Sequence, residues 1–133
     1  MRLRTLVALA TSATVSLAAC GGGGSDRLSE ADFVDELADI CADTNSQMDA
    51  IEAGGFDDFT DLADSADQAV DALTDTRDRL SELTPPEDLE RDLEDFVDVV
   101  DDQIDAFGDF GTAARNEDDA ALQAASDDLD QLT

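Results

Sequence analysis

The stretch that decides the fold is Leu89–Asp109, which reads LERDLEDFVDVVDDQIDAFGD. With about 100° between successive residues, seven of its apolar side chains fall within an arc of about 100° on a helical wheel. They are Leu89, Leu93, Phe96, Val97, Val100, Ile104 and Phe107. The opposite arc carries the acids Asp95, Asp98, Asp101, Asp102, Asp105 and Asp109. An apolar stripe opposite an acidic one is typical of a helix that packs on a core and turns its other face to water.

A helix with the same kind of pattern is expected to precede it, beginning at Ser29. Ser29 is expected to be the N-cap, with Asp32 three residues later, and Leu28 and Phe33 occupy the positions of a hydrophobic staple. Gly54-Gly55 is expected to end this helix. Its shared face carries Phe33, Leu37, Ile40, Cys41, Thr44, Met48 and Ile51.

A second helix is expected over about Asp57–Leu83, with an interior rich in alanine that would let a neighbouring helix approach closely. The Thr-Pro-Pro-Glu stretch at 84–87 should end it and start the third helix, with the threonine as cap. The third helix is expected to run to about Phe107, because Gly108 and Gly111 weaken a helix beyond that point. The apolar face of the second helix carries Phe59, Leu62, Ala63, Ala66, Val70, Leu73, Leu80 and Leu83.

A shorter fourth helix fits Glu117–Leu132, with Asn116 as its cap and Leu122, Ala125, Leu129 and Leu132 facing inward. No alternating strand pattern and no internal repeat interrupts this series. Because the connections are short, neighbouring helices should be antiparallel. The sequence therefore predicts an all-α domain over residues 29–133, an up-and-down bundle of three long helices plus a shorter C-terminal helix.

The residues before this domain have the pattern of a signal sequence. Arg2 and Arg4 are followed by residues 6–19, which carry no charge and are too few to cross a bilayer as a helix. Leu17-Ala18-Ala19-Cys20 then resembles the lipobox of bacterial lipoproteins, in which the cysteine thiol receives a diacylglyceryl group. We expect residues 1–19 to be a cleaved signal peptide, Cys20 to be lipidated, and residues 20–28 to be a Gly-rich tether. The alternative is a plain secreted protein with an incidental cysteine near its cleavage site.

The charge is one-sided, with 35 acidic side chains against 7 arginines among 133 residues, and no lysine or histidine. We do not expect the chain to bind nucleic acid through phosphate contacts, because such binding depends on clustered basic side chains. Without histidine or lysine, one chain cannot supply imidazole catalysis, a histidine-ligated metal or a lysine Schiff base. All 35 acids lie beyond Cys20, so the predicted mature chain is still more acidic than the whole.

Two kinds of side chain remain as candidates for chemistry, the second cysteine and the carboxylates. Cys41 is expected to be a buried structural thiol; an intermolecular disulfide and a reactive thiol are the alternatives. The carboxylates cluster at residues 57–64 and 98–105, but no segment matches a calcium-binding loop. We expect solvated helix faces there, with no metal site, no cofactor and no catalytic residue.

The chain resembles the small helical lipoproteins of actinobacteria, in its lipobox, its Gly-rich tether and the LSELTPPEDL stretch at 80–89 that leads into a helix. In such proteins the cysteine of the first helix often pairs with one near the C-terminus, whereas no cysteine follows Cys41 here. The resemblance implies a lipid anchor on the extracytoplasmic face of the cell membrane and a helical fold.

These patterns predict a structural or protein-interaction module without catalytic activity. We expect it to contact the membrane through its lipid anchor and to have a protein partner in the cell envelope. The alternative is a binding module for divalent cations, cationic peptides or another small ligand through the acidic surface.

Overall fold

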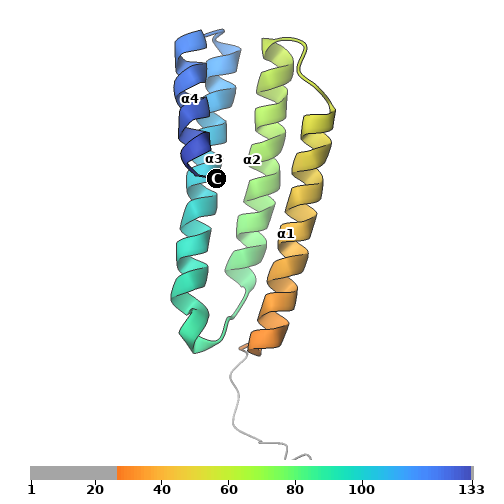
Figure 1. Ribbon diagram of the computed structural model, residues 1–133, viewed down its shortest axis with the longest axis vertical. Coiled ribbons are helices and arrows are strands. Elements are labelled where there is room, and N and C mark those ends of the chain that lie inside the picture. The colour runs from red at the N-terminus through yellow and green to blue at the C-terminus, as the bar shows by residue number, and fades with distance from the viewer. Residues whose placement is uncertain (1–26, 133) are drawn as a thin grey trace, which may run out of the picture.

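The computed structural model describes residues 27–132, and within this range the chain is helical, with no strand. The elements are α1 (Glu30–Ala53), α2 (Phe59–Glu82), the short 3-10 helix η1 (Glu87–Leu89), α3 (Glu90–Arg115) and α4 (Asp119–Gln131). The helices run alternately up and down (Figure 1). The predicted all-α bundle of three long helices and a shorter C-terminal one is confirmed.

The helices pack in the order of the chain. α2 and α3 lie side by side along most of their length, α1 lies against α2, and α4 lies against the second half of α3 (Figure 1). No Cα atom of α1 comes within 8 Å of a Cα atom of α4. α1 and α4 therefore stand as the two outer helices of a layer that curves around the core side chains.

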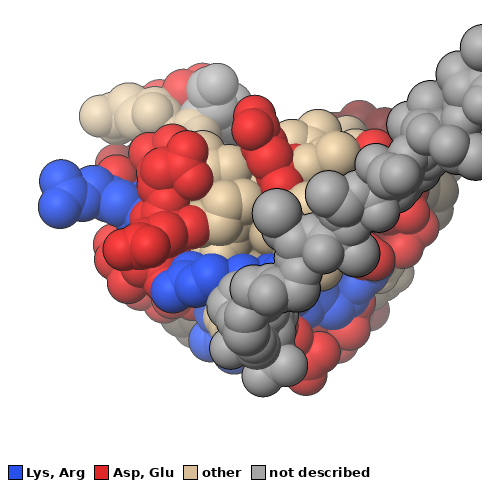
Figure 2. Space-filling view, turned by 90° about the horizontal axis from the view of Figure 1, so that it is seen from below, with Lys and Arg blue, Asp and Glu red and all other residues tan. Residues whose placement is uncertain are grey.

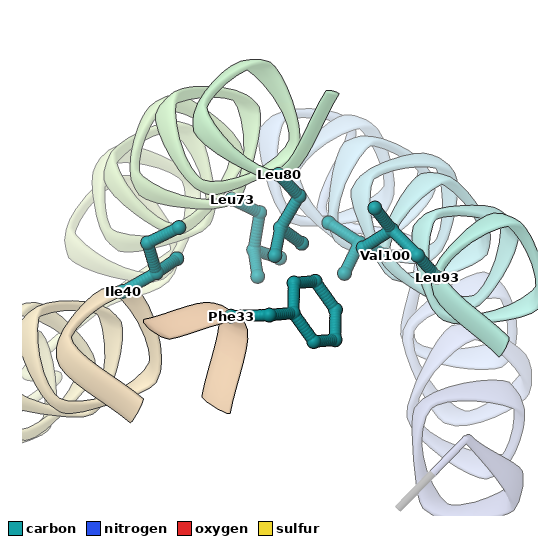
Figure 3. Close-up of a cluster of buried hydrophobic side chains, with 6 residues drawn as sticks. All are labelled: Phe33, Ile40, Leu73, Leu80, Leu93 and Val100. Carbon is teal, nitrogen blue, oxygen red and sulfur yellow. The ribbon is translucent and has the colours of Figure 1, made fainter. Parts of the chain in front are cut away.

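The main core lies toward the end of the bundle at which α1 begins. Its buried side chains come from α1, α2 and α3 and point toward one another (Figure 3): Phe33, Ile40, Leu73, Leu80, Leu93 and Val100. Leu80 has no exposed surface. Each belongs to an apolar face predicted from the sequence. Phe96, also placed on such a face, lies at its edge and is 38% exposed.

The predicted close approach of a helix to the alanines of α2 is confirmed. Ala63, Ala66, Ala69 and Ala72 are all buried in α2, and Gly111 of α3 lies so close that a Cβ built on it would be 3.0 Å from the Cβ of Ala66. The predicted end of the third helix at about Phe107 is wrong. The helix continues to Arg115 because Gly111 fits this contact, and packing outweighs the low helix propensity of glycine.

The beginning of α1 matches its prediction, and the beginning of α2 shifts by two residues. The Ser29 hydroxyl accepts a hydrogen bond from the Asp32 N–H at 3.2 Å. α2 starts at Phe59 because the Asp58 carboxylate accepts the N–H groups of Thr60 and Asp61 at 2.8 and 3.0 Å. A short carboxylate in this position satisfies backbone donors that the helix leaves unpaired.

Two predicted caps are wrong. Thr84 does not cap the third helix: its carbonyl oxygen accepts the Leu28 N–H at 2.8 Å, and η1 precedes α3. Asn116 ends α3 instead of starting α4, and Glu117 follows with a positive φ of 52°. The Asp118 carboxylate then caps α4, so that helix begins at Asp119 rather than Glu117.

Candidate functional site

An apolar groove lies toward the end of the bundle farthest from the start of α1. All four helices and the α1–α2 loop contribute to it, and its volume is about 360 Å³. We call it the distal groove and define it by Met48, Ile51 and Glu52 of α1, Phe56 of the loop, Leu62, Ser65, Ala66 and Ala69 of α2, Phe107 and Phe110 of α3, and Leu129 of α4.

Three of the four α2 residues that line the groove have small side chains, Ser65, Ala66 and Ala69, whereas larger side chains line it on the outer helices. Ala66 and Ala69 leave room above α2. Met48 of α1 and Leu129 of α4 line the groove from helices that have no Cα atoms within 8 Å of each other. The alanine spacing that lets α2 and α3 approach closely therefore also leaves a hollow between α1 and α4.

Phe56 is the most exposed large side chain of the groove. It lies in the loop that follows α1, and 48% of its surface is exposed. Single exposed apolar residues are ordinary, but one that joins an apolar hollow enlarges a continuous apolar surface, and such surfaces mark binding sites in soluble domains.

The charge in the lining of this groove is acidic. Glu52 is its one charged lining residue, and no arginine lines it. Four arginines of the described chain instead join neighbouring elements, in the ion pairs Arg27–Glu90, Arg77–Asp101, Arg79–Asp43 and Arg115–Asp67. At the opposite end of the bundle, where α1 begins, acidic side chains also occupy much of the visible surface and arginines lie among them (Figure 2).

These ion pairs are exposed, so each contributes little on its own. The Arg115 Nη1 atom lies 3.0 and 2.9 Å from the two carboxylate oxygens of Asp67, which ties α3 to α2. The hydrogen bond that Arg77 donates to Asp78, together with the charge of Asp78, raises the pKa of the Arg77 guanidinium. Arg77 and Arg115 therefore link α2 and α3, and neither lines the distal groove.

A second hollow, of about 380 Å³, lies where α2 ends and α3 begins. Three carboxylates line it, those of Glu90, Glu94 and Asp98. Arg27 already pairs with Glu90 there. Its mixed lining offers less continuous apolar surface than the distal groove, which is the better candidate site.

Of the cysteines singled out in the sequence, Cys20 lies outside the described residues. Cys41 is half-buried on α1 and forms no disulfide within the described part of the chain. The expected buried thiol is thus partly exposed, at the edge of the apolar face of its helix.

The carboxylate clusters have local structural uses. Asp58 caps α2, the Asp61 carboxylate accepts the Asp57 N–H at 3.1 Å, and Asp101 pairs with Arg77. Among residues 27–132, no three acidic or thiol side chains form a group that could hold a metal ion. Asp58, Asp61 and Asp101 therefore contribute to local structure or to contacts between helices.

Sequence reasoning missed the distal groove, although it placed most of its lining residues on apolar faces. Phe56 and Phe110 carried a signal, because both are large apolar residues outside the predicted helices. In the part of the chain that the structure describes, no helix has the length and apolar character needed to cross a membrane. Comparison with protein-family models, curated proteins and solved structures gives no match.

Proposed function

We propose that this chain is a lipoprotein anchored on the extracytoplasmic face of the cell membrane, where it acts as a structural or protein-interaction module without catalytic activity. The observation that carries the anchoring is the sequence Leu17-Ala18-Ala19-Cys20 after a basic start and an uncharged stretch. As in the small helical lipoproteins of actinobacteria that it resembles, Cys20 would carry the lipid.

The polarity of the bundle supports this proposal. The described chain enters the bundle at the end where α1 begins (Figure 1). The residues that line the distal groove include the last part of α1 and the first part of α2, toward the other end. α1 has 24 residues, so it is about 36 Å long at about 1.5 Å per residue. An anchor at Cys20 would hold the first end near the membrane and present the groove away from it.

The acidic surface supports a position of the domain in water, clear of the membrane. Membranes with anionic lipids carry a negative surface potential that attracts basic protein segments. The chain beyond residue 19, with 35 acids against 5 arginines, is repelled by such a surface. The Gly-rich stretch at 21–24 would let the lipidated cysteine stay in the bilayer while the domain remains in water.

The interaction role rests on the exposed apolar groove together with the residue types of the chain. Without histidine or lysine, the sequence lacks the side chains most often used for proton transfer and Schiff-base chemistry. A groove lined by Met48, Phe107 and Phe110 offers apolar contact surface of the kind that partner proteins bury.

The test is the intact mass of the mature N-terminal peptide, after expression in a bacterium that processes lipoproteins. We expect a peptide that begins at Cys20 and carries the mass of a diacylglyceryl group. Cys41→Ser should leave this peptide unchanged, whereas Cys20→Ser should abolish it. A mature chain that begins at another residue, or an unmodified Cys20, would overturn the anchoring part of the proposal.

A further inference from the structure

We propose that the distal groove binds a cationic amphipathic helix of a protein partner. This inference deepens the proposed function, on which it rests for the role of the chain as an interaction module. It adds where the partner binds, which secondary structure it presents and which charge it carries.

The shape of the groove fits the side chains along one face of a helix. Its walls are α1 and α4, which have no Cα atoms within 8 Å of each other, and its floor is α2 and α3. Helices pack with their axes about 8–10 Å apart, so a helix laid between two separated helices can contact both. In such complexes a few apolar side chains at helical spacing enter the groove.

The lining supplies the contacts that such a helix needs. Phe107 and Phe110 lie one helical turn apart on α3, and Met48 faces the same hollow from α1. Aromatic residues often dominate the binding energy of interfaces, and methionine adapts its shape to the side chains it meets. Phe56 lies in the loop at the rim with 48% of its surface exposed, so its ring adds apolar surface that an occupant can bury.

The charge of the chain indicates which kind of partner helix the groove binds. Glu52 lines the groove, and the whole chain has a formal net charge of −28. A second copy would bring the same charge and be repelled, and so would an anionic lipid surface. A helix with basic side chains flanking its apolar face is instead attracted to this chain by opposite charge. The occupant is therefore cationic as well as apolar.

Binding of synthetic peptides to the purified full chain with Cys20→Ser tests this inference without any lipid. The probe is a Leu/Lys peptide of about five helical turns with its leucines on one face. Its controls are a peptide of the same composition in scrambled order and a Leu/Glu peptide of the same pattern. We expect one-to-one binding of the patterned Leu/Lys peptide, about tenfold or more tighter than that of the scrambled one, because its apolar face can be buried. No binding of the Leu/Glu peptide is expected.

Two variants locate the binding. Ser65→Trp places a large ring in the groove, whereas Ser46→Trp places one on an exposed part of α1 outside it. Ser65→Trp should weaken the patterned peptide by about tenfold, the effect of excluding a large apolar side chain, and Ser46→Trp should leave it unchanged. Phe56→Ala, in the loop, is the second groove variant in case Ser65→Trp impairs folding, which circular dichroism would reveal.

Three results would overturn the inference. One is equal binding of the patterned and scrambled Leu/Lys peptides, which would leave only attraction between opposite charges. Another is unchanged peptide binding in both groove variants. The third is a dimer in light scattering that Ser65→Trp dissociates, which would make a second copy the occupant. Because the assay involves no lipid, each of these leaves the anchoring at Cys20 standing, and an unmodified Cys20 would leave the peptide result standing.

Discussion

At the scale of single residues, the position of an acidic residue on its helix decides whether its negative charge stabilises or destabilises the fold. The Asp58 and Asp118 carboxylates each accept two backbone N–H groups at the start of a helix, where negative charge is also favoured by the helix dipole. Acids four residues apart within a helix, such as Asp35 and Asp39, repel each other. The same residue type therefore both stabilises and destabilises this fold.

Replacement of the α2 cap tests this distinction. Asp58→Ala should lower the free energy of unfolding by about 1 kcal/mol, because the N–H groups of Thr60 and Asp61 lose their acceptor. Asp57→Ala is the matched control, since it removes one negative charge next door and keeps the backbone N–H that Asp57 donates to Asp61. Urea unfolding of the two variants measures the difference. Equal effects would show that the cap contributes nothing beyond its charge.

The caps also show how far local sequence reaches. Ser29 was predictable because its partner Asp32 lies in the same turn and the apolar pattern begins just after it. Asn116 and Asp118 are both good capping residues, and the choice between them depends on where α3 ends. The end of α3 is set by its packing against α2. The residues of α2 are distant in the sequence, so the residues around position 116 do not reveal it.

At the scale of elements, the contact between α2 and α3 fixes the length and the separation of the two central helices. Gly111 and Ala66 meet where neither helix carries a larger side chain. Gly108, three residues earlier on the same helix, has no atom within 4 Å of a Cβ built on it, apart from its own helix backbone and chain neighbours. The two glycines thus have the same low helix propensity, but Gly108 faces open space and Gly111 lies in a close contact.

A pair of alanine substitutions separates propensity from packing. Gly108→Ala should raise the free energy of unfolding by about 0.5–1 kcal/mol, because alanine favours the helix and meets open space. Gly111→Ala should lower it by about 1 kcal/mol or more, because the new methyl group pushes against Ala66 and forces the helices apart. Thermal or urea unfolding measures both. Stabilisation by both substitutions would contradict the close contact.

The periodicity of each helix made the elements and most of the core predictable, as Phe33, Leu80 and Val100 illustrate. The extension of α3 past Phe107 was not predictable, since glycine propensity is local and the contact with Ala66 is not. The distal groove was also beyond the sequence. It depends on the gap between α1 and α4, which arises from how four amphipathic faces share one core.

At the scale of the whole molecule, the two halves of the proposed function have different foundations. The candidate lipidation site, Cys20, is recognised by a short local motif, so the sequence alone could propose it. The groove is assembled from residues as far apart as Met48 and Leu129, so only the fold could reveal it. The groove requires that the acidic residues form the outside of a folded domain.

The central claim is therefore that these acids form the solvated surface of one cooperatively folded bundle, and unfolding followed by helical circular dichroism at increasing NaCl tests it most directly. Screening shortens the reach of charge from about 30 Å at 0.01 M to about 3 Å at 1 M, so repulsion within the acidic surface should fade. Relief of about 1 kcal/mol shifts the midpoint of a small domain by about 4–8 °C. We predict a single cooperative transition whose midpoint rises by about 5 °C or more, mostly below about 0.5 M, where screening changes most. A gradual, non-cooperative loss of helix, or a midpoint that does not move with salt, would contradict the claim.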